Sequence, residues 1–548
     1  MVPTVSSLIV PSGGVQISAT GGAGDDAFSV RMDPGGATVS FFENDPSCTG
    51  TPACTAASAD LRQIVVTGGG GSDLLVVDFA TGNPIPAGGL IYDGGSGPGI
   101  DTLEIRGGRC DAGTYTPTGR DSGVLTYTGG DIGAATIMFA GLEPVVDTVT
   151  EPTFTINGTN AADTITLDNG TATADGRIRV TSPSFESIEF ANKTNVIING
   201  GTTTADQGDT FNLTNTEAST GLATVTVNTG PGAGGSQAGD SVFVRSTPAG
   251  VTTTVNGDAG PDLIRVASLT DTVDAILGPV TVNGNANTDA LQIADENSSG
   301  PTGGFSYAIT GNTIGRNGAA TITYGGVELF FLDARNATPP AGDSISLSVA
   351  LGVAYTINAG TGNDAFIVLF GNPGGLTLNG QGGTDTLVGP TAGATWNLTG
   401  PGQGNIAGAV TSYQNFENLA GGAAADAFVF QSGGTVLGGS VNGTIDGGGG
   451  TDTLDYSAAV GSIHANLGIG ITAAAGLDGV QQTPPNGSAA TGTATLTYTP
   501  AVDAVNLGTF DISLTVTGIS ASDPNLQINL LQGPSGVAGS GVVSLFNT

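Results

Sequence analysis

The segment that decides the fold reads Asn379-Gly-Gln-Gly-Gly-Thr-Asp385-Thr-Leu-Val388. Asn-Gly and the Gly pair that follows it permit the positive φ angles that a tight corner requires. After Asp385, polar and apolar residues alternate with the two-residue period of a β-strand, and another short run of this kind, Thr377-Leu378, precedes the corner. We therefore predict a repeated unit of strand, Asn-Gly corner, Gly-rich bend, aspartate and strand.

Copies of this unit recur along the chain. The close copies are GGAGDDAFSV from Gly21, GGGGSDLLVV from Gly68, NGDAGPDLIRV from Asn256, AGTGNDAFIV from Ala359 and GGGGTDTLDY from Gly447. More divergent copies are NGTNAADTITL from Asn157, NGNANTDALQI from Asn283 and GGAAADAFVF from Gly421. Asp343, Asp364 and Asp385 follow one another at intervals of 21 residues, and one solenoid coil takes about 20 to 30 residues. The spacing favours an all-β, parallel β-helix-like solenoid. The alternative is a chain of β-sandwiches, whose strands follow one another about every 8–12 residues.

Composition excludes several other classes. The chain has 548 residues, with 93 Gly, 12 Lys or Arg and 47 Asp or Glu, which gives a formal charge of −35. Nucleic-acid binding needs a basic footprint that is absent here, and helical bundles tolerate few Gly inside helices. The Gly residues are clustered rather than placed at every third position, which excludes collagen. A hydrophobic content of 38% is too high for an acidic disordered polymer.

The repeats are interrupted by β-rich inserts at residues 109–145 and 301–340. Four similar fragments centred on Glu143, Glu186, Glu328 and Glu417 mark equivalent points of a larger repeat of two coils. We predict four domains. They are an N-terminal repeat block with a β insert (1–150), solenoid repeats (151–300), solenoid repeats with an insert (301–472) and a C-terminal β-sandwich-like domain (473–548).

The corners also match the nonapeptide Gly-Gly-x-Gly-x-Asp-x-apolar-x. The match is full at Gly21–Ser29, Gly68–Val76 and Gly447–Asp455, and nearly full at Ala359–Ile367 and Gly257–Arg265. At these points the chain resembles the RTX, or haemolysin-type, calcium-binding family. The resemblance implies secretion and calcium-dependent folding, because a Gly-rich bend exposes backbone carbonyls beside the carboxylate that binds Ca²⁺. The ligands that it implies are Asp26, Asp73, Asp262, Asp364, Asp385 and Asp452.

This sequence departs from that family in one respect. The family's nonapeptides run in tandem so that neighbouring turns share an ion, whereas these are at least 21 residues apart. Sharing would require adjacent coils to stack. The alternative is that each aspartate caps its own bend by accepting hydrogen bonds from backbone amides.

Cysteine usage is sparse. Cys48 and Cys54 flank a short loop, and we predict a disulfide between them, with unpaired structural thiols as the alternative. Cys110 is left over. A zinc-type site would need more ligands than the chain offers, since His464 is its only histidine.

From Gly476 the sequence changes in character and resembles a CHRD domain, a β-rich module of many exported bacterial proteins. The resemblance covers about 75 residues. It rests on Gly479-Val-Gln-Gln482, Pro484-Pro485, Ala490-Thr-Gly492-Thr-Ala494-Thr, Leu514-Thr-Val-Thr-Gly518 and Gly533-Pro534. The family's His-x-His is replaced by Ile528-Asn-Leu-Leu-Gln532, which argues against a histidine-based ligand site.

Catalytic signatures are weak. Arg106, Arg109, Lys193, Arg265 and Arg335 share no motif, and the acidity of the chain would repel an acidic polysaccharide. His464 alternates with apolar residues like a surface strand residue. We therefore predict that the chain is not an enzyme, with a β-helix polysaccharide-active enzyme as a remote alternative.

The leading hypothesis is a non-catalytic, secreted structural protein of the cell surface. It would be a calcium-stabilised, self-assembling subunit of a filament, layer or matrix, with itself or other surface proteins as partners. The runner-up is a calcium-dependent adhesin with a solenoid stalk and a C-terminal module that binds glycan or protein. No run of about 18 apolar residues occurs, so we predict no membrane span.

Overall fold

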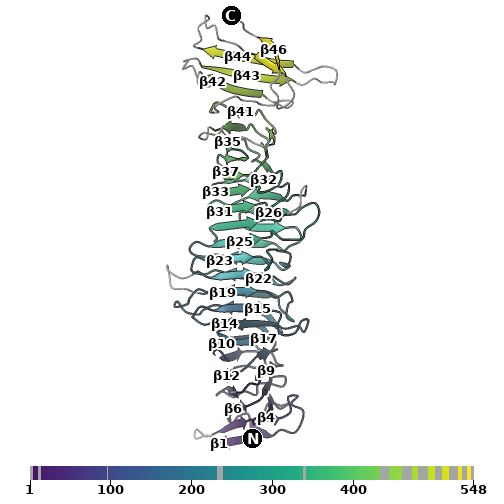
Figure 1. The fold of residues 1–548 in the computed structure, drawn as a ribbon. Coiled ribbons are helices and arrows are strands. Elements are labelled where there is room, and N and C mark those ends of the chain that lie inside the picture. The colour runs from purple at the N-terminus through teal and green to yellow at the C-terminus, as the bar shows by residue number, and fades with distance from the viewer. Residues whose placement is uncertain are drawn as a thin grey trace. The chain divides into compact units, whose positions relative to one another are not determined.

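The computed structural model confirms the predicted all-β solenoid (Figure 1). It describes residues 4–9, 14–95, 97–230, 239–336, 341–431 and 443–458, followed by the strands within 472–544. These residues form no helix, and none of them therefore lies in a helix that could cross a membrane. They divide into two compact units, residues 1–299 with 312–333 and residues 300–311 with 334–548. The predicted boundaries at 150, 300 and 472 stay predictions.

The first unit contains two sheets, here called the first and second sheet. The first sheet comprises β1 (Thr4–Ile9), β2 (Val15–Thr20), β6 (Leu61–Gly69), β8 (Leu90–Gly95), β10 (Ala112–Gly119), β11 (Ser122–Thr128), β12 (Ala135–Ala140), β14 (Glu151–Asn157), β18 (Lys193–Asn199), β20 (Thr224–Asn228), β22 (Thr252–Asn256), β24 (Val280–Asn283), β27 (Thr313–Arg316) and β28 (Ile322–Gly325). The second sheet comprises β3 (Ala27–Met32), β4 (Thr38–Glu43), β5 (Cys54–Ala57), β7 (Leu74–Asp78), β9 (Thr102–Arg106), β13 (Val145–Asp147), β15 (Thr164–Asp168), β16 (Ile178–Ser182), β17 (Phe185–Phe190), β19 (Thr210–Leu213), β21 (Ser241–Val244), β23 (Leu263–Val266), β25 (Ala290–Ala294) and β29 (Leu329–Asp333).

The second unit repeats this arrangement. One of its stacks comprises β26 (Ser306–Thr310), β30 (Ser344–Ser348), β32 (Ala365–Phe370), β34 (Thr386–Val388), β38 (Asn418–Ala420) and β40 (Ile445–Asp446). The other comprises β31 (Ala354–Asn358), β33 (Asn372–Asn379), β35 (Thr395–Gly400), β36 (Gln403–Ile406), β37 (Val410–Gln414), β39 (Ala427–Phe430) and β41 (Thr453–Asp455). Towards the C-terminus the chain forms β42 (Thr472–Asp478), β43 (Thr491–Thr499), β44 (Thr509–Thr517), β45 (Asn529–Gln532) and β46 (Ser540–Ser544). The remaining residues from 473 onward, and so most of the CHRD resemblance, lie outside the described residues.

Parallel pairing of successive coils places like residues above one another. In the first sheet, Ile198, Val227, Val255 and Val282 are register partners from β18 to β24. In the second sheet, Phe211, Val242, Ile264, Leu291 and Phe330 form the equivalent row. All of these side chains are buried between the sheets. Each contributes roughly 1.5–3 kcal/mol relative to an exposed side chain, so the apolar rows are the main source of stability.

The predicted insert at residues 109–145 lies inside the first sheet. In the predicted insert at 301–340, β27 and β28 pair antiparallel and β28 pairs in parallel with β24. Strands β10, β11 and β12 form an antiparallel meander, of which β12 pairs in parallel with β8, and β10 pairs in parallel with β14. Strands β15, β16 and β17 do the same in the second sheet, between β13 and β19. The first meander contributes three strands to the first sheet, and the second meander contributes three strands to the second sheet. The two sheets therefore keep equal numbers of strands, and the following coils again place one strand in each sheet.

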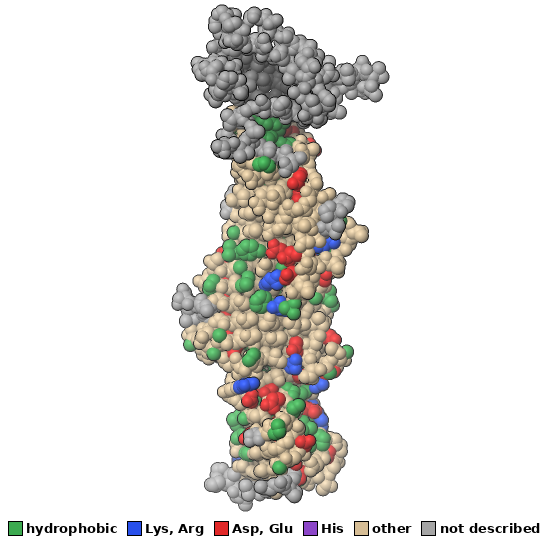
Figure 2. Space-filling view, viewed as in Figure 1, with side chains coloured by type: hydrophobic (Ala, Val, Ile, Leu, Met, Phe, Trp, Pro, Cys, Tyr) green, Lys and Arg blue, Asp and Glu red, His purple; other side chains and the backbone are tan. Residues whose placement is uncertain are grey.

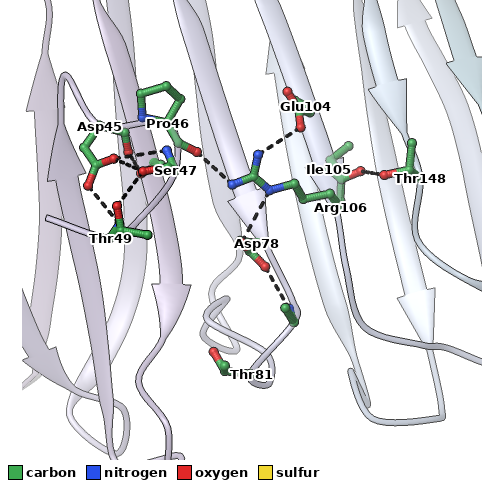
Figure 3. A network of polar contacts seen from close by, with 12 residues as sticks. Asp45, Pro46, Ser47, Thr49, Asp78, Thr81, Glu104, Ile105, Arg106 and Thr148 are labelled. Carbon is green, nitrogen blue, oxygen red and sulfur yellow. Dashed lines mark hydrogen bonds and ion pairs between the residues drawn. The ribbon is translucent and has the colours of Figure 1, made fainter.

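The loop between β4 and β5 holds Cys48, and Cys54 is the first residue of β5. The Asp45 carboxylate accepts hydrogen bonds from the Ser47 hydroxyl and from the backbone N–H groups of Gly50, Thr49 and Ser47, and these lower its pKa. Arg106 on β9 fastens the loop, because its guanidinium donates to the Pro46 carbonyl at 2.8 Å and contacts Asp78 on β7 (Figure 3). Cys48 is buried and Cys54 is half-exposed, and both are free thiols in this structure. The predicted disulfide between them stays a prediction.

The acidic residues are distributed differently from what the charge of −35 suggests. Among the residues that the structure describes, eighteen Asp and Glu side chains are buried. One face of the molecule shows mostly uncharged polar side chains and backbone, with acidic groups in small clusters (Figure 2). The buried acids lie mainly at the Gly-rich corners, which the next section describes.

Close packing leaves no room for a side chain on one glycine of each corner. A Cβ on Gly284 would lie 2.7 Å from the Asp289 carboxylate and would overlap the Gly326 carbonyl. A Cβ on Gly325, one coil further in the same sheet, would meet nothing within 4 Å. We expect Gly284→Ala to reduce the free energy of unfolding by about 1–3 kcal/mol, and Gly325→Ala to leave it unchanged within about 1 kcal/mol. Chemical denaturation of both variants checks this, and equal losses would contradict the corner geometry.

Candidate functional site, a carboxylate ladder at the corners

The corner aspartates of successive coils are joined by hydrogen bonds into what we call the carboxylate ladder. In each step, the backbone N–H of one corner aspartate donates to the carboxylate of the next coil. The steps are Asp163 to Asp209 (2.7 Å), Asp209 to Asp240 (2.5 Å), Asp240 to Asp262 (2.7 Å), Asp262 to Asp289 (2.8 Å) and Asp289 to Glu328 (2.9 Å). The ladder therefore continues the main-chain pairing of the sheet around the corner, where the strands have ended.

Shorter ladders occur elsewhere in both units. In the first unit, Asp26 donates to Asp73 (2.7 Å) and Asp73 donates to Asp101 (2.8 Å). In the second unit, the steps are Asp343 to Asp364 (2.6 Å), Asp364 to Asp385 (2.8 Å), Asp385 to Glu417 (2.7 Å) and Asp426 to Asp452 (2.9 Å). The ladders through Asp289 and Asp385 end on a glutamate, Glu328 and Glu417 respectively. The longer side chain reaches the amide that an aspartate would otherwise bind.

The second oxygen of each ladder carboxylate faces its own bend. The backbone N–H of Gly22 donates to Asp26 Oδ2 at 2.5 Å, and that of Gly422 donates to Asp426 Oδ2 at 2.8 Å. A Cβ on the first glycine of the bend would collide with this oxygen, as at Gly257, where the separation from Asp262 Oδ2 would be 2.7 Å. The Gly-x-x-x-x-Asp spacing is therefore a packing requirement.

Burial raises the pKa values of six ladder carboxyls. The pKa of Asp209 rises to about 8, those of Asp262, Asp364 and Asp385 to about 7, and those of Asp240 and Asp289 to about 6. The accepted N–H bond opposes this rise and the neighbouring carboxylates add to it. Among the described atoms, Oδ2 of Asp209, Asp240, Asp262, Asp289, Asp364 and Asp385 has no hydrogen-bond partner. A proton on this oxygen removes the cost of a buried charge.

The structure places all six predicted calcium ligands on the ladders. Asp26, Asp73, Asp262, Asp364 and Asp385 are buried, and Asp452 is half-buried. Asp26 accepts a backbone amide of its own bend, as the amide-capping alternative expects. The other five accept the amide of a corner aspartate in the neighbouring coil, which neither alternative anticipated. In the part of the chain that the structure describes, no group of three or more acidic, Cys or His side chains is arranged to hold a metal ion. Calcium binding stays a prediction from the resemblance.

Sequence reasoning missed several ladder members and their linkage between coils. Asp163, Asp209, Asp240, Asp289, Asp343 and Asp426 belong to the ladders as fully as the predicted residues do. The signal was present in the fragments centred on Glu328 and Glu417, whose strands pair in register with those that follow Asp289 and Asp385. The spacing of these fragments indicated that Glu328 and Glu417 occupy equivalent positions in the repeat. It did not indicate which backbone amide each of them binds.

An asparagine ladder runs along the other side of each corner in the first unit. The side-chain amide of each corner asparagine donates to the one before it, at 2.7–2.9 Å, along Asn157, Asn199, Asn228, Asn256 and Asn283. Beside it lies a groove of about 650 Å³ lined by Asn199, Gly201, Thr202, Asn228, Gly230, Asp258 and Asn285. The groove offers amide, hydroxyl and carboxylate groups, the chemistry that polar ligands such as sugars require.

Comparison with known proteins adds no assignment. No protein-family model matches the chain, and a search of curated proteins gave no significant match.

The raised pKa values predict an unusual pH dependence. Between the unfolded pKa of about 3.9 and the folded values of about 6 to 8, the native protein binds more protons than the unfolded chain, so stability falls as pH rises. Below about pH 4 the opposite contribution from Asp45, whose pKa is lowered, is lost. We expect the melting temperature to be highest near about pH 5 and lower by at least about 5 °C at pH 8.

Asp262→Asn is the matched variant, because an amide keeps an acceptor for Asp240 N–H without a titrating proton. Thermal melts from pH 4 to 8 should show a shallower decline in this variant. A wild-type melting temperature that rises steadily from pH 5 to pH 8 would contradict the account of the ladder.

Calcium removal gives a further prediction. If hydrogen bonds hold the corners, the chelated protein stays folded, and CaCl₂ and NaCl at matched ionic strength raise the melting temperature equally by screening the acidic residues. Calorimetry with and without a chelator measures both effects. A shift specific to calcium at micromolar concentration would instead support the RTX-like sites.

Proposed function

We propose that this chain is a non-catalytic structural protein of the cell surface, a self-associating subunit of an extracellular filament, layer or matrix. The carboxylate ladder is the observation that carries the proposal. The carboxylates of the repeated corner aspartates accept hydrogen bonds from backbone amides of the preceding coil, so the repeat extends and stiffens the scaffold. Calcium dependence stays the prediction that the titration above tests.

The outer surface supports the same proposal. Charged side chains form only small clusters on the face shown in Figure 2, and the remainder is largely uncharged polar side chain and backbone. Leu351, Leu369 and Phe370 of the second unit are exposed, the last to 72%. Exposed apolar side chains close together in the sequence give association with other surface proteins a starting point.

Two measurements test the proposal, namely the location of the chain in its source cells and its self-association in solution. Immunogold electron microscopy of source cells, with antibodies against this chain, should label the outer surface, and sedimentation velocity of the purified chain should show assemblies that grow with concentration. Label confined to the cytoplasm would contradict the proposal. A strict monomer at all concentrations would remove self-association from it.

The groove beside the asparagine ladder favours the adhesin as a second candidate. Its Asp258 accepts a hydrogen bond from the Gly230 N–H at 3.4 Å and lies among side-chain amides that could bind sugar hydroxyls. A glycan array with the full chain tests this. Binding that Asp258→Asn abolishes would place the ligand in the groove, whereas binding lost only on deletion of residues 473–548 would place it in the C-terminal module. No binding to any glycan would reject the glycan-binding adhesin.

A further inference from the structure

The only lysine in the chain, Lys193, is fully buried in the first unit. It begins β18, and its Nζ lies beside two acids, Asp147 at the end of β13 and Glu151 at the start of β14. The distances are 2.9 Å from Nζ to Asp147 Oδ1 and 2.5 Å from Nζ to Glu151 Oε1. All three side chains have 0% exposure. An amine and two carboxyls are thus held together away from water.

The surroundings differ between the two acids. Asp147 Oδ1 accepts the Val149 N–H at 2.9 Å, and Asp147 Oδ2 accepts the Tyr127 hydroxyl at 2.9 Å. Glu151 receives the weaker thiol of Cys110, at 3.1 Å from Sγ to Oε2. The strong donors are therefore placed on Asp147, where an added nucleophile would generate negative charge on oxygen.

The pKa of Glu151 favours a reaction between the amine and a carboxyl in this cluster. Burial raises the pKa of Glu151 to about 7, with the Lys193 charge opposing the rise. A buried ion pair pays a desolvation cost that neutral partners avoid, so transfer of a proton from the ammonium to Glu151 is eased. The Phe154 ring, 4.9 Å from Nζ, closes the site on another side.

We propose that Lys193 and Asp147 condense to form an intramolecular isopeptide bond. Glu151 takes a proton from the Lys193 ammonium, and the free Nζ attacks Cγ of Asp147 while Tyr127 and the Val149 N–H stabilise the oxyanion. Glu151 then passes this proton, and after it the second amine proton, to the departing Asp147 oxygen, which leaves as water. The sum is ammonium plus carboxylate giving amide plus one water, with no oxidant, reductant or cofactor.

The geometry meets the requirement for this reaction. Reacting groups that are held in contact, unable to diffuse apart, gain effective molarities far above those in solution. The bond would close a loop between residues 46 apart in sequence and would join two successive coils covalently. The isopeptide bond does not depend on the cell-surface function proposed above, so either proposal can fail without the other.

Intact mass spectrometry of the full chain tests the proposal. We expect a mass 18 Da below that of the sequence, and Lys193→Arg should restore the unmodified mass for its own sequence. Asp295→Asn changes a buried acid outside the cluster and is the matched control, which should keep the deficit. A wild-type mass equal to that of the sequence would overturn the proposal.

Peptide analysis then locates the bond. Trypsin should leave residues 121–177 joined to residues 180–245, since Lys193 in the second peptide can no longer be cleaved. Fragmentation should place the branch on Asp147, and a branch on Glu151 would contradict the assignment of roles. Glu151→Gln should lose the cross-link while its circular dichroism spectrum stays like that of wild type.

Amine labelling of the denatured wild-type chain gives a readout that needs no variant. Because the chain has one lysine, a cross-linked chain carries only the N-terminal amine, whereas a free Lys193 adds a second labelled site. Labelling at Lys193 in the whole population would overturn the proposal.

Discussion

The hydrogen bond from a corner N–H to a buried carboxylate of the next coil is the interaction on which the rest of the structure depends. A solenoid strand satisfies its own amides by pairing, but the chain leaves the sheet at each corner and exposes an amide that needs a partner. The ladder aspartates supply that partner in coil after coil. Their other oxygen occupies the space over a glycine Cα, which fixes the composition of the bend.

The sequence was sufficient to predict the coil and its corner, because both follow from local patterns. The two-residue period of Thr164–Asp168 and the Gly cluster before Asp385 report strand and bend directly. The identity of the bonded amide could not be predicted, since Asp163 and its partner Asp209 are 46 residues apart. The meanders posed a similar problem, because residues 109–145 looked like an external decoration, yet β10 and β12 pair with β14 and β8 inside the sheet.

The structure also changes the interpretation of the acidic composition. The formal charge of −35 comes from 47 Asp and Glu residues, and among the described residues eighteen of these acids are buried. Burial raises the pKa of Asp209 to about 8 and those of Asp262, Asp364 and Asp385 to about 7, so part of the formal charge is neutralised by protons near neutral pH. Lys193 lies in this core between two buried acids, Asp147 and Glu151.

Hydrogen–deuterium exchange at the corner amides tests the ladder most directly. The N–H groups of Asp240 and Asp262 lie outside the strands, at turns where amides normally exchange fast. If they donate to buried carboxylates, their exchange at neutral pH should be as slow as that of Val242 and Ile264 in the adjoining strands. Exchange at the rate of an exposed turn amide would contradict the ladder as the element that holds the coils together.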